Sequence, residues 1–131
     1  MLTKIKVSDY MSTTLVTFTE STDIFEAIKT MAEARITSAP VINEEGQMVG
    51  IFSESDCMNA AICATYNQVE GGDVGKYMSS EIMSIKAESN ILEVTNQFND
   101  SHIRSLLVYD DVGLVGIISR TDVLKAIATF H

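Results

Sequence analysis

Hydrophobic and polar residues follow one another along this chain in an order that predicts short strands and amphipathic helices. Leu15 to Phe18 is a short apolar run that predicts a strand, and apolar residues at helical spacing predict a helix from about Asp23. Apolar runs at 39–42 and 48–52 predict two more strands, and a closing helix is predicted from Glu54 to about Thr65. The first half therefore reads as strand, helix, strand, strand, helix.

The second half predicts the same five elements in the same order. Strands are expected at Ile82 to Ile85, 106–109 and 114–118, and helices from Asn90 and from Arg120 to about Phe130. Both first helices begin at a residue that caps well, Asp23 or Asn90, with a glutamate three residues later. Tight turns are predicted where Asn, Asp and Gly gather, at 43–46 and 110–113.

This order reflects an internal repeat, because the stretch from Val7 to Ala61 returns, diverged, from Val74 to Ile127. We expect a first repeat at 1–66, a polar, glycine-containing linker at 67–73 and a second repeat at 74–131. A unit of about 60 residues buries little surface and is marginal alone. The two repeats are therefore expected to share one core.

Composition excludes several classes of function. A net charge of −9 argues against nonspecific nucleic-acid binding, which needs Lys and Arg at the phosphates. No apolar run approaches the roughly 20 residues that span a bilayer, and Met1 to Lys6 has no signal-peptide core. Cys57 and Cys63 show no metal spacing and are expected to be reduced thiols. These features predict a cytoplasmic protein without nucleic-acid or membrane partners.

One pattern carries chemistry in both repeats, Gly-Ile-x-Ser-x-[Ser/Thr]-Asp at Gly50 to Asp56 and Gly116 to Asp122. Its serine falls at a helix N-terminus, where free N–H groups favour an anion. Its aspartate could accept hydrogen bonds from the vicinal hydroxyls of a ribose. Ser-x-x-Asp is also close to a capping box, which needs no ligand, and the repetition does not separate the two interpretations.

No catalytic set and no metal site is predicted. His102 and His131 lie far apart, without Cys or a second His at metal spacing, and no Ser-His-Asp set, carboxylate pair or phosphate loop is found. An enzyme is therefore the least favoured class.

The chain resembles a tandem pair of cystathionine-β-synthase (CBS) domains, the arrangement called a Bateman module. The similarity is carried by Val7…Tyr10-Met11, Ile36 to Ile42, Val49 to Ile51 and Ser53-x-x-Asp56, each echoed in the second half. The resemblance implies an α+β fold of two β-α-β-β-α repeats, packed through their sheets with pseudo-two-fold symmetry. It also implies that adenine nucleotides bind in clefts between the repeats, with Ser/Thr at the phosphate and Asp at the ribose.

Two unequal sites follow from the resemblance. In the stronger site Ser119 and Asp122 would hold phosphate and ribose, and Arg104 matches a position that often carries a phosphate-facing basic residue. The other expected members of this site are Met11, Val16, Ile36, Thr37, Ser38, Ile117 and Thr121. In the weaker site Ser53 and Asp56 would take the polar roles, and the base would lie against Met78, Met83, Ile103 and Ser105.

The ranking depends on where the repeats differ. Thr37 stands in the first repeat where the second has Arg104, and Glu54 stands where the second has Arg120. A guanidinium bonded to phosphate contributes about 1.5–3 kcal/mol. A di- or triphosphate is therefore expected beside Ser119, and the Ser53 side is expected to take adenosine-like ligands or to stay empty.

These expectations combine into a non-catalytic regulatory module. It would sense AMP, ADP, ATP or a related ligand such as S-adenosylmethionine or NAD, require no cofactor, form a homodimer and pass the signal to a partner protein. The alternative is an interaction module with degenerate pockets that docks on an enzyme or transporter.

Overall fold

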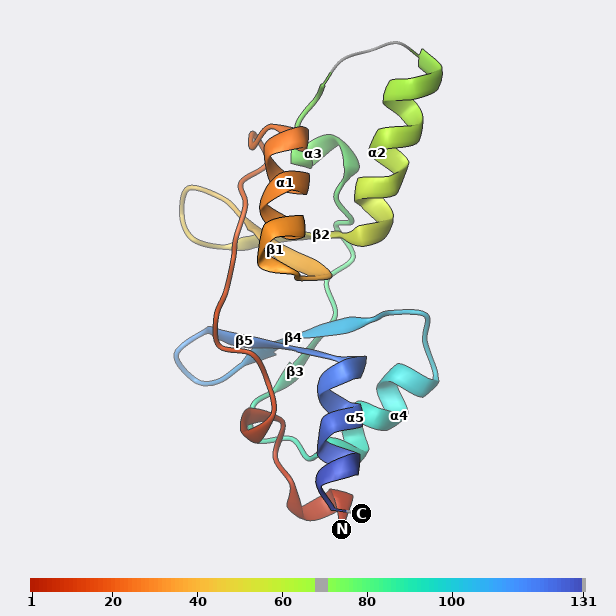
Figure 1. Ribbon diagram of the computed structural model, residues 1–131. Helices are drawn as coiled ribbons and strands as arrows, with labels where there is room; N and C mark the ends of the chain where they lie inside the picture. Colours follow the sequence, from red (N-terminus) through yellow and green to blue (C-terminus); the bar gives the residue numbers. More distant parts are fainter. Residues whose placement is uncertain (68–70, 131) are drawn as a thin grey trace. The chain divides into compact units, whose positions relative to one another are not determined.

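The computed structural model of this protein describes residues 1–67 and 71–130. Its first repeat contains α1 (Ile24–Ala34), β1 (Ser38–Ile42), β2 (Met48–Ser53) and α2 (Glu54–Asn67). Its second repeat contains α3 (Val74–Tyr77), β3 (Ser84–Lys86), α4 (Ile91–Asn99), β4 (Ser105–Tyr109), β5 (Leu114–Ser119) and α5 (Arg120–Thr129) (Figure 1). Short 3₁₀ turns occupy Leu2–Lys4 and Val7–Asp9. The predicted α+β class is confirmed.

The predicted helix starts are confirmed at atomic detail. Asp23 Oδ2 accepts hydrogen bonds from the backbone N–H groups of Phe25 and Glu26, both at 3.1 Å. Asn90 Oδ1 accepts one from the N–H of Glu93 at 2.9 Å. Each side chain satisfies donors that the first helical turn leaves without a partner.

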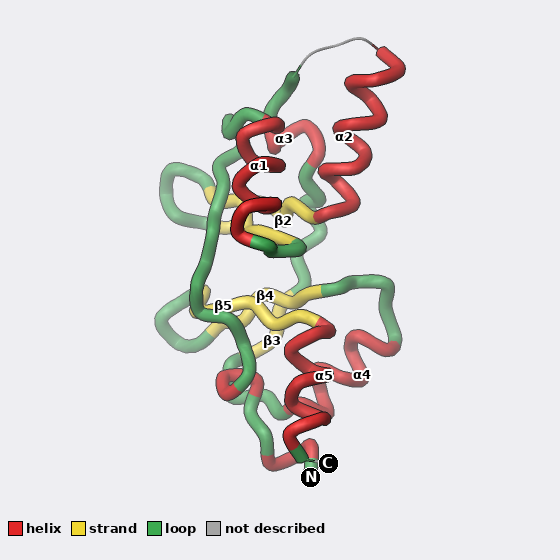
Figure 2. Tube along the Cα trace, viewed as in Figure 1, coloured by secondary structure: helices red, strands yellow, loops and turns green. Residues whose placement is uncertain are grey.

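The sheets differ between the repeats. β1 and β2 form an antiparallel pair, whereas β4 pairs antiparallel with β5 and parallel with β3. The predicted strand at Leu15 to Phe18 is wrong, because only Phe18 pairs, in a single bridge to Val41, and Figure 2 draws the approach to α1 as loop. The ring of Phe18 is buried, 6.0 Å edge-on from the ring of Phe52, whereas Thr17 is exposed.

The chain forms two compact units whose boundaries differ from those of the repeats. Unit 1 contains Met1–Leu15 and Met83–His131, and unit 2 contains Val16–Ile82. In unit 1 the N–H of Val7 donates to Ser89 O at 2.8 Å, and in unit 2 the N–H of Val74 donates to Thr22 O at 2.9 Å. Each unit therefore takes the segment that opens the other repeat.

Each unit has its own cluster of buried side chains. The cluster of unit 1 includes Val7 from the first repeat, and that of unit 2 includes Val74 from the second, both fully buried. Figure 1 shows the helices of each unit on one face of its sheet, α4 and α5 in unit 1 and α1 and α2 in unit 2. Both repeats contribute to each core through these exchanged segments.

Candidate functional site

The Ser-x-x-Asp pattern forms a closed capping box in the second repeat. Ser119 is the N-cap of α5, and its Oγ accepts a hydrogen bond from the backbone N–H of Asp122 at 3.3 Å. Asp122 Oδ2 accepts from the N–H of Ser119 at 2.9 Å and from the hydroxyl of Ser119 at 3.1 Å. Ser53 and Asp56 repeat this arrangement at 2.8, 3.0 and 3.4 Å at the start of α2.

This geometry limits what each side chain can offer to a ligand. Asp122 Oδ2 already accepts two hydrogen bonds, and the proton of the Ser119 hydroxyl is directed to it. Among the described residues nothing bonds to Asp122 Oδ1 or to the hydroxyl of Thr121, which is exposed in the first turn of α5. A ribose could therefore use one carboxylate oxygen without breaking the cap, because an ionised carboxylate oxygen has two lone-pair sites.

A close backbone crossing lies beside each capping box. In unit 1 the N–H of Ser12 donates to Ile117 O at 2.8 Å and the N–H of Ile117 returns to Ser12 O at 3.0 Å. A Cβ on Gly116 would stand 2.7 Å from both Met11 Sδ and Ser12 O, so only glycine admits this segment. The segment that makes this close approach is Met11 and Ser12.

Unit 2 contains the same crossing. Ile51 exchanges hydrogen bonds with Ser79 at 2.8 and 2.9 Å, and a Cβ on Gly50 would stand 2.7 Å from Met78 Sδ. Met11 and Met78 thus lie next to Gly116 and Gly50, each in the same unit as its glycine.

Arg104 precedes β4, and its carbonyl accepts the backbone N–H of Arg120 at 3.1 Å. The same bond joins Thr37 O to the N–H of Glu54 at 3.0 Å in unit 2. Since Ser105 pairs with Ser119 across β4 and β5, the backbone of Arg104 lies next to the capping box.

The Arg120 side chain donates to backbone carbonyls of its own unit. Its Nε donates to Ile103 O at 3.0 Å, and its Nη2 donates to Phe98 O at 2.6 Å and Ser101 O at 3.0 Å. The guanidinium is therefore bonded to the backbone that joins α4 to β4. No sequence signal indicates this, because the partners are carbonyls 17 to 22 residues away.

The predicted site residues fall into the two units as follows. Unit 1 contains Met11, Met83, Ile103, Arg104, Ser105, Ile117, Ser119, Thr121 and Asp122. Unit 2 contains Val16, Ile36, Thr37, Ser38, Ser53, Asp56 and Met78. The structure brings the predicted phosphate and ribose residues of the stronger site together in unit 1, and those of the weaker site in unit 2.

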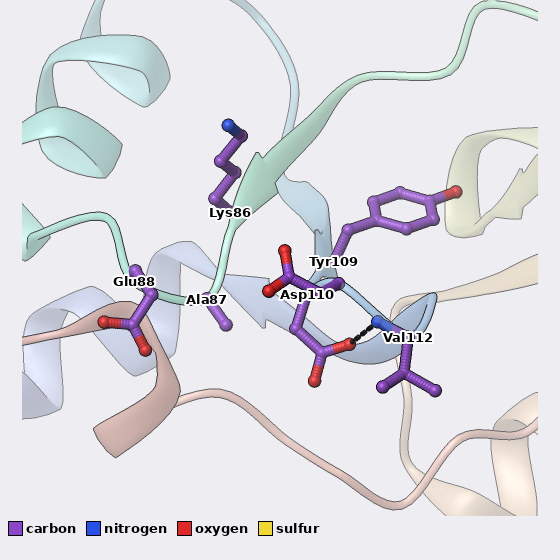
Figure 3. Close-up of a pocket in the computed structure, with 7 residues that line it drawn as sticks. Lys86, Ala87, Glu88, Tyr109, Asp110 and Val112 are labelled. Carbon is purple, nitrogen blue, oxygen red and sulfur yellow. Dashed lines mark hydrogen bonds between the residues drawn. The ribbon is translucent and has the colours of Figure 1, made fainter.

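A separate open cavity of about 410 Å³ lies in unit 1, away from the capping box. Its lining consists of Lys86, Ala87, Glu88, Tyr109, Asp110, Asp111 and Val112 (Figure 3). Asp110 Oδ1 accepts the N–H groups of Val112 at 2.8 Å and Gly113 at 3.2 Å, so this carboxylate stabilises its own turn. Burial raises the pKa of Tyr109, which keeps its phenol neutral.

No three His, Cys, Asp or Glu side chains gather in the described part of the chain as a metal site would need. No helix in residues 1–67 or 71–130 has the length and apolar character to cross a membrane.

Curated relatives match the chain at low identity. The chain is 26% identical over 124 residues to an uncharacterized protein of Methanocaldococcus jannaschii, covering 94% of this chain and 43% of that protein. It is 27% identical over 115 residues to the 5'-AMP-activated protein kinase subunit gamma-3 of Sus scrofa, covering 82% and 22%. The chain thus spans less than half the length of these relatives.

Solved structures match nearly the whole chain. A conserved protein of Pyrococcus horikoshii has a TM-score of 0.84 at 27% identity, with 97% of this chain and 95% of that chain covered. CBSX2, a CBS-pair protein of Arabidopsis thaliana solved in complex with AMP, has a TM-score of 0.80 at 24% identity, with 96% and 98% covered. A CBS domain pair in complex with 5'-methylthioadenosine and S-adenosyl-L-methionine has a TM-score of 0.82 at 22% identity, with 96% and 98% covered.

The family model described as "CBS domain" matches residues 7–62 and again residues 73–129. These two matches cover most of the chain and coincide with the internal repeat seen in the sequence. The chain belongs to the CBS domain family.

Proposed function

We propose that this chain is a regulatory module that binds an adenosine-containing ligand and passes the signal to a partner protein. The proposal takes its ligand class from similar proteins, which were solved with AMP or with S-adenosyl-L-methionine and 5'-methylthioadenosine. At 24% and 22% identity those structures show the fold alone, so their ligands define the panel of compounds to test. The relative named for activation by AMP supports the same panel.

The main support for the proposal is the group of polar side chains at the start of α5. Asp122 Oδ1 and the Thr121 hydroxyl are available to a ribose, and the helix N-terminus favours a phosphate. The backbone of Arg104 is held next to these groups through Ser105 and Arg120. A cation there favours a charged phosphate, whereas the matching position in unit 2 is Thr37.

Calorimetry with AMP, ADP, ATP and S-adenosylmethionine tests this ranking. Asp122→Ala and Asp56→Ala both remove a capping carboxylate, so each is expected to lower stability by a similar amount, about 1 kcal/mol. Asp122→Ala is expected to weaken nucleotide binding about tenfold or more, or about 1.4 kcal/mol. Asp56→Ala is the matched control and should bind nearly as the wild type does. Equal binding by Asp122→Ala and wild type would refute the ranking.

The alternative is an interaction module whose pockets take no ligand. It is favoured by one observation, since both Ser-x-x-Asp sets are closed on themselves as capping boxes. Thermal unfolding separates the two functions, because a ligand at 100 times its Kd adds about 2.7 kcal/mol of stability. Melting curves that no adenosyl compound moves would favour the interaction module.

The module is also proposed to form a homodimer. On α2, Met58, Ile62 and Tyr66 recur every four residues and are 65%, 55% and 82% exposed. On α5, Leu124 is 65% exposed, and Phe130, which follows the helix, is 49% exposed. Apolar side chains gathered on helices are typical of a protein interface, and a second copy offers the same surface in return.

A further inference from the structure

Arg120 joins two segments of unit 1 that are distant in sequence. Its guanidinium donates to the carbonyls of Phe98, Ser101 and Ile103, and its carbon lies 5.4 Å from the centre of the Phe98 ring. A planar, permanently charged guanidinium can bond several carbonyls at once, which a lysine ammonium cannot match in geometry. The positive charge of Arg120 therefore lies at the C-terminal end of α4, where the helix dipole favours a cation.

The first repeat shows why the second needs this arginine. There α1 has 11 residues and closes on Arg35, whose left-handed conformation (φ 55°, ψ 41°) lets Ile36 N–H reach Met31 O at 3.2 Å. In the second repeat α4 has only 9 residues and reaches Asp100 in a right-handed conformation. The chain from Asp100 to Arg104 lacks that left-handed closure. Ser101 donates from its N–H to Phe98 O at 3.5 Å and from its hydroxyl to Gln97 O at 2.8 Å, and Arg120 adds bonds to the carbonyls of Phe98, Ser101 and Ile103.

We propose that Arg120 is a positioning residue for phosphate recognition. It holds the 100–104 segment, and thereby Arg104, next to the Ser119 capping box, so that Arg104 is the phosphate-binding cation and Arg120 is not. Glu54 at the matching place in unit 2 has no N–H donors in its side chain and cannot do this. The proposal rests on the function proposed above, because it explains which repeat accepts phosphate.

The test compares Arg120→Gln, Arg104→Gln and the double variant, with Arg35→Gln, which removes the same charge from an exposed side chain of the first repeat, as the control. Binding of adenosine, AMP and ATP is measured by calorimetry, and amide hydrogen exchange is measured across 100–105. Arg120→Gln is expected to weaken ATP about tenfold, to change adenosine binding less than about twofold, and to speed exchange across the segment. Arg104→Gln should weaken ATP to a similar degree with exchange unchanged.

The double variant is decisive, because two residues that act through one contact are not additive. It should bind ATP no more weakly than Arg104→Gln alone. Additive losses would mean that Arg120 itself contacts phosphate and would overturn the proposal, as would unchanged exchange in Arg120→Gln. Arg120→Lys keeps the charge with fewer donors and is expected to lie between wild type and Arg120→Gln in exchange, which keeps the test valid should the Gln variant unfold.

Failure of the proposed function is distinguishable from failure of this inference. A wild type that binds neither adenosine nor ATP refutes the ligand class and, with it, the phosphate role of Arg104. Wild-type binding with unchanged exchange in Arg120→Gln refutes only the positioning role. Arg35→Gln should leave both readouts as in the wild type, and a shift in ATP binding there would mean that the loss of a positive charge alone accounts for the effect.

Discussion

Cys57 connects the chemistry of one side chain to the pH dependence of the fold. Burial raises the pKa of its thiol, and the nearby carboxylates of Asp56 and Glu54 raise it further. The folded state therefore favours the neutral thiol. This contribution to stability is complete below the pKa of the thiol in the unfolded chain, about 8.5, and is lost as pH rises through the raised value in the folded chain.

Thermal melts between pH 7 and pH 10 test this effect. The wild type is expected to lose more stability over that range than Cys57→Ser, whose hydroxyl does not ionise. Cys63→Ser keeps Cys57 and should follow the wild type. Parallel pH curves for the wild type and Cys57→Ser would contradict the raised pKa.

For single residues, the sequence predicts which side chains form the candidate site better than it predicts their hydrogen-bond partners. Ser119 and Asp122 are found from a repeated pattern, and their capping geometry is one of the two interpretations that the pattern allows. The bonds of Arg120 are not predictable, since a carbonyl acceptor can belong to any residue. They form where α4 ends, and the end of a helix is the part that a sequence pattern places least reliably.

Elements are predicted most reliably where local signals agree. Capping residues and apolar periodicity together place α1 and α4, and turn residues place the β1–β2 and β4–β5 hairpins. Leu15 to Phe18 has strand-forming residues, but a strand needs a partner along its length, and here only Phe18 bonds to its neighbour. The turn at Val7–Asp9 has no periodic pattern and was not expected.

The exchanged segments give a prediction about elements. Val7 and Val74 occupy matching places in the repeats, and both are fully buried, but in different units. Truncating a buried valine to alanine costs about 2 kcal/mol. Val7→Ala is therefore expected to speed amide exchange at Leu106 and Val108 in the second repeat, and Val74→Ala at Val41 and Phe52 in the first.

Hydrogen exchange measured on both variants decides between the exchanged and the repeat-by-repeat arrangement. If each segment packed within its own repeat, Val7→Ala would instead loosen Val41 and Phe52. Val112→Ala is a suitable control, because Val112 is 94% exposed and should leave both sets of amides unchanged.

At the scale of the whole molecule, the proposed homodimer predicts the effect of a surface charge. Ile62→Glu and Leu124→Glu change exposed side chains, so each should have little effect on a monomer. Buried at an apolar interface, the same carboxylate would be costly. Analytical ultracentrifugation is expected to show a dimer for the wild type and for Val112→Glu, and a monomer for the other two variants. A monomeric wild type would contradict the proposal.

The two units also differ in whether they are continuous in sequence. Unit 2 is one continuous stretch, Val16–Ile82, whereas unit 1 joins Met1–Leu15 to Met83–His131. When the ribosome adds Met83, every residue of unit 2 has been synthesised, whereas of unit 1 only Met1–Leu15 has. Unit 2 can thus complete its core on the nascent chain, while Val7, synthesised among the first residues, has to wait for Ile91 and Ile118 before it is covered.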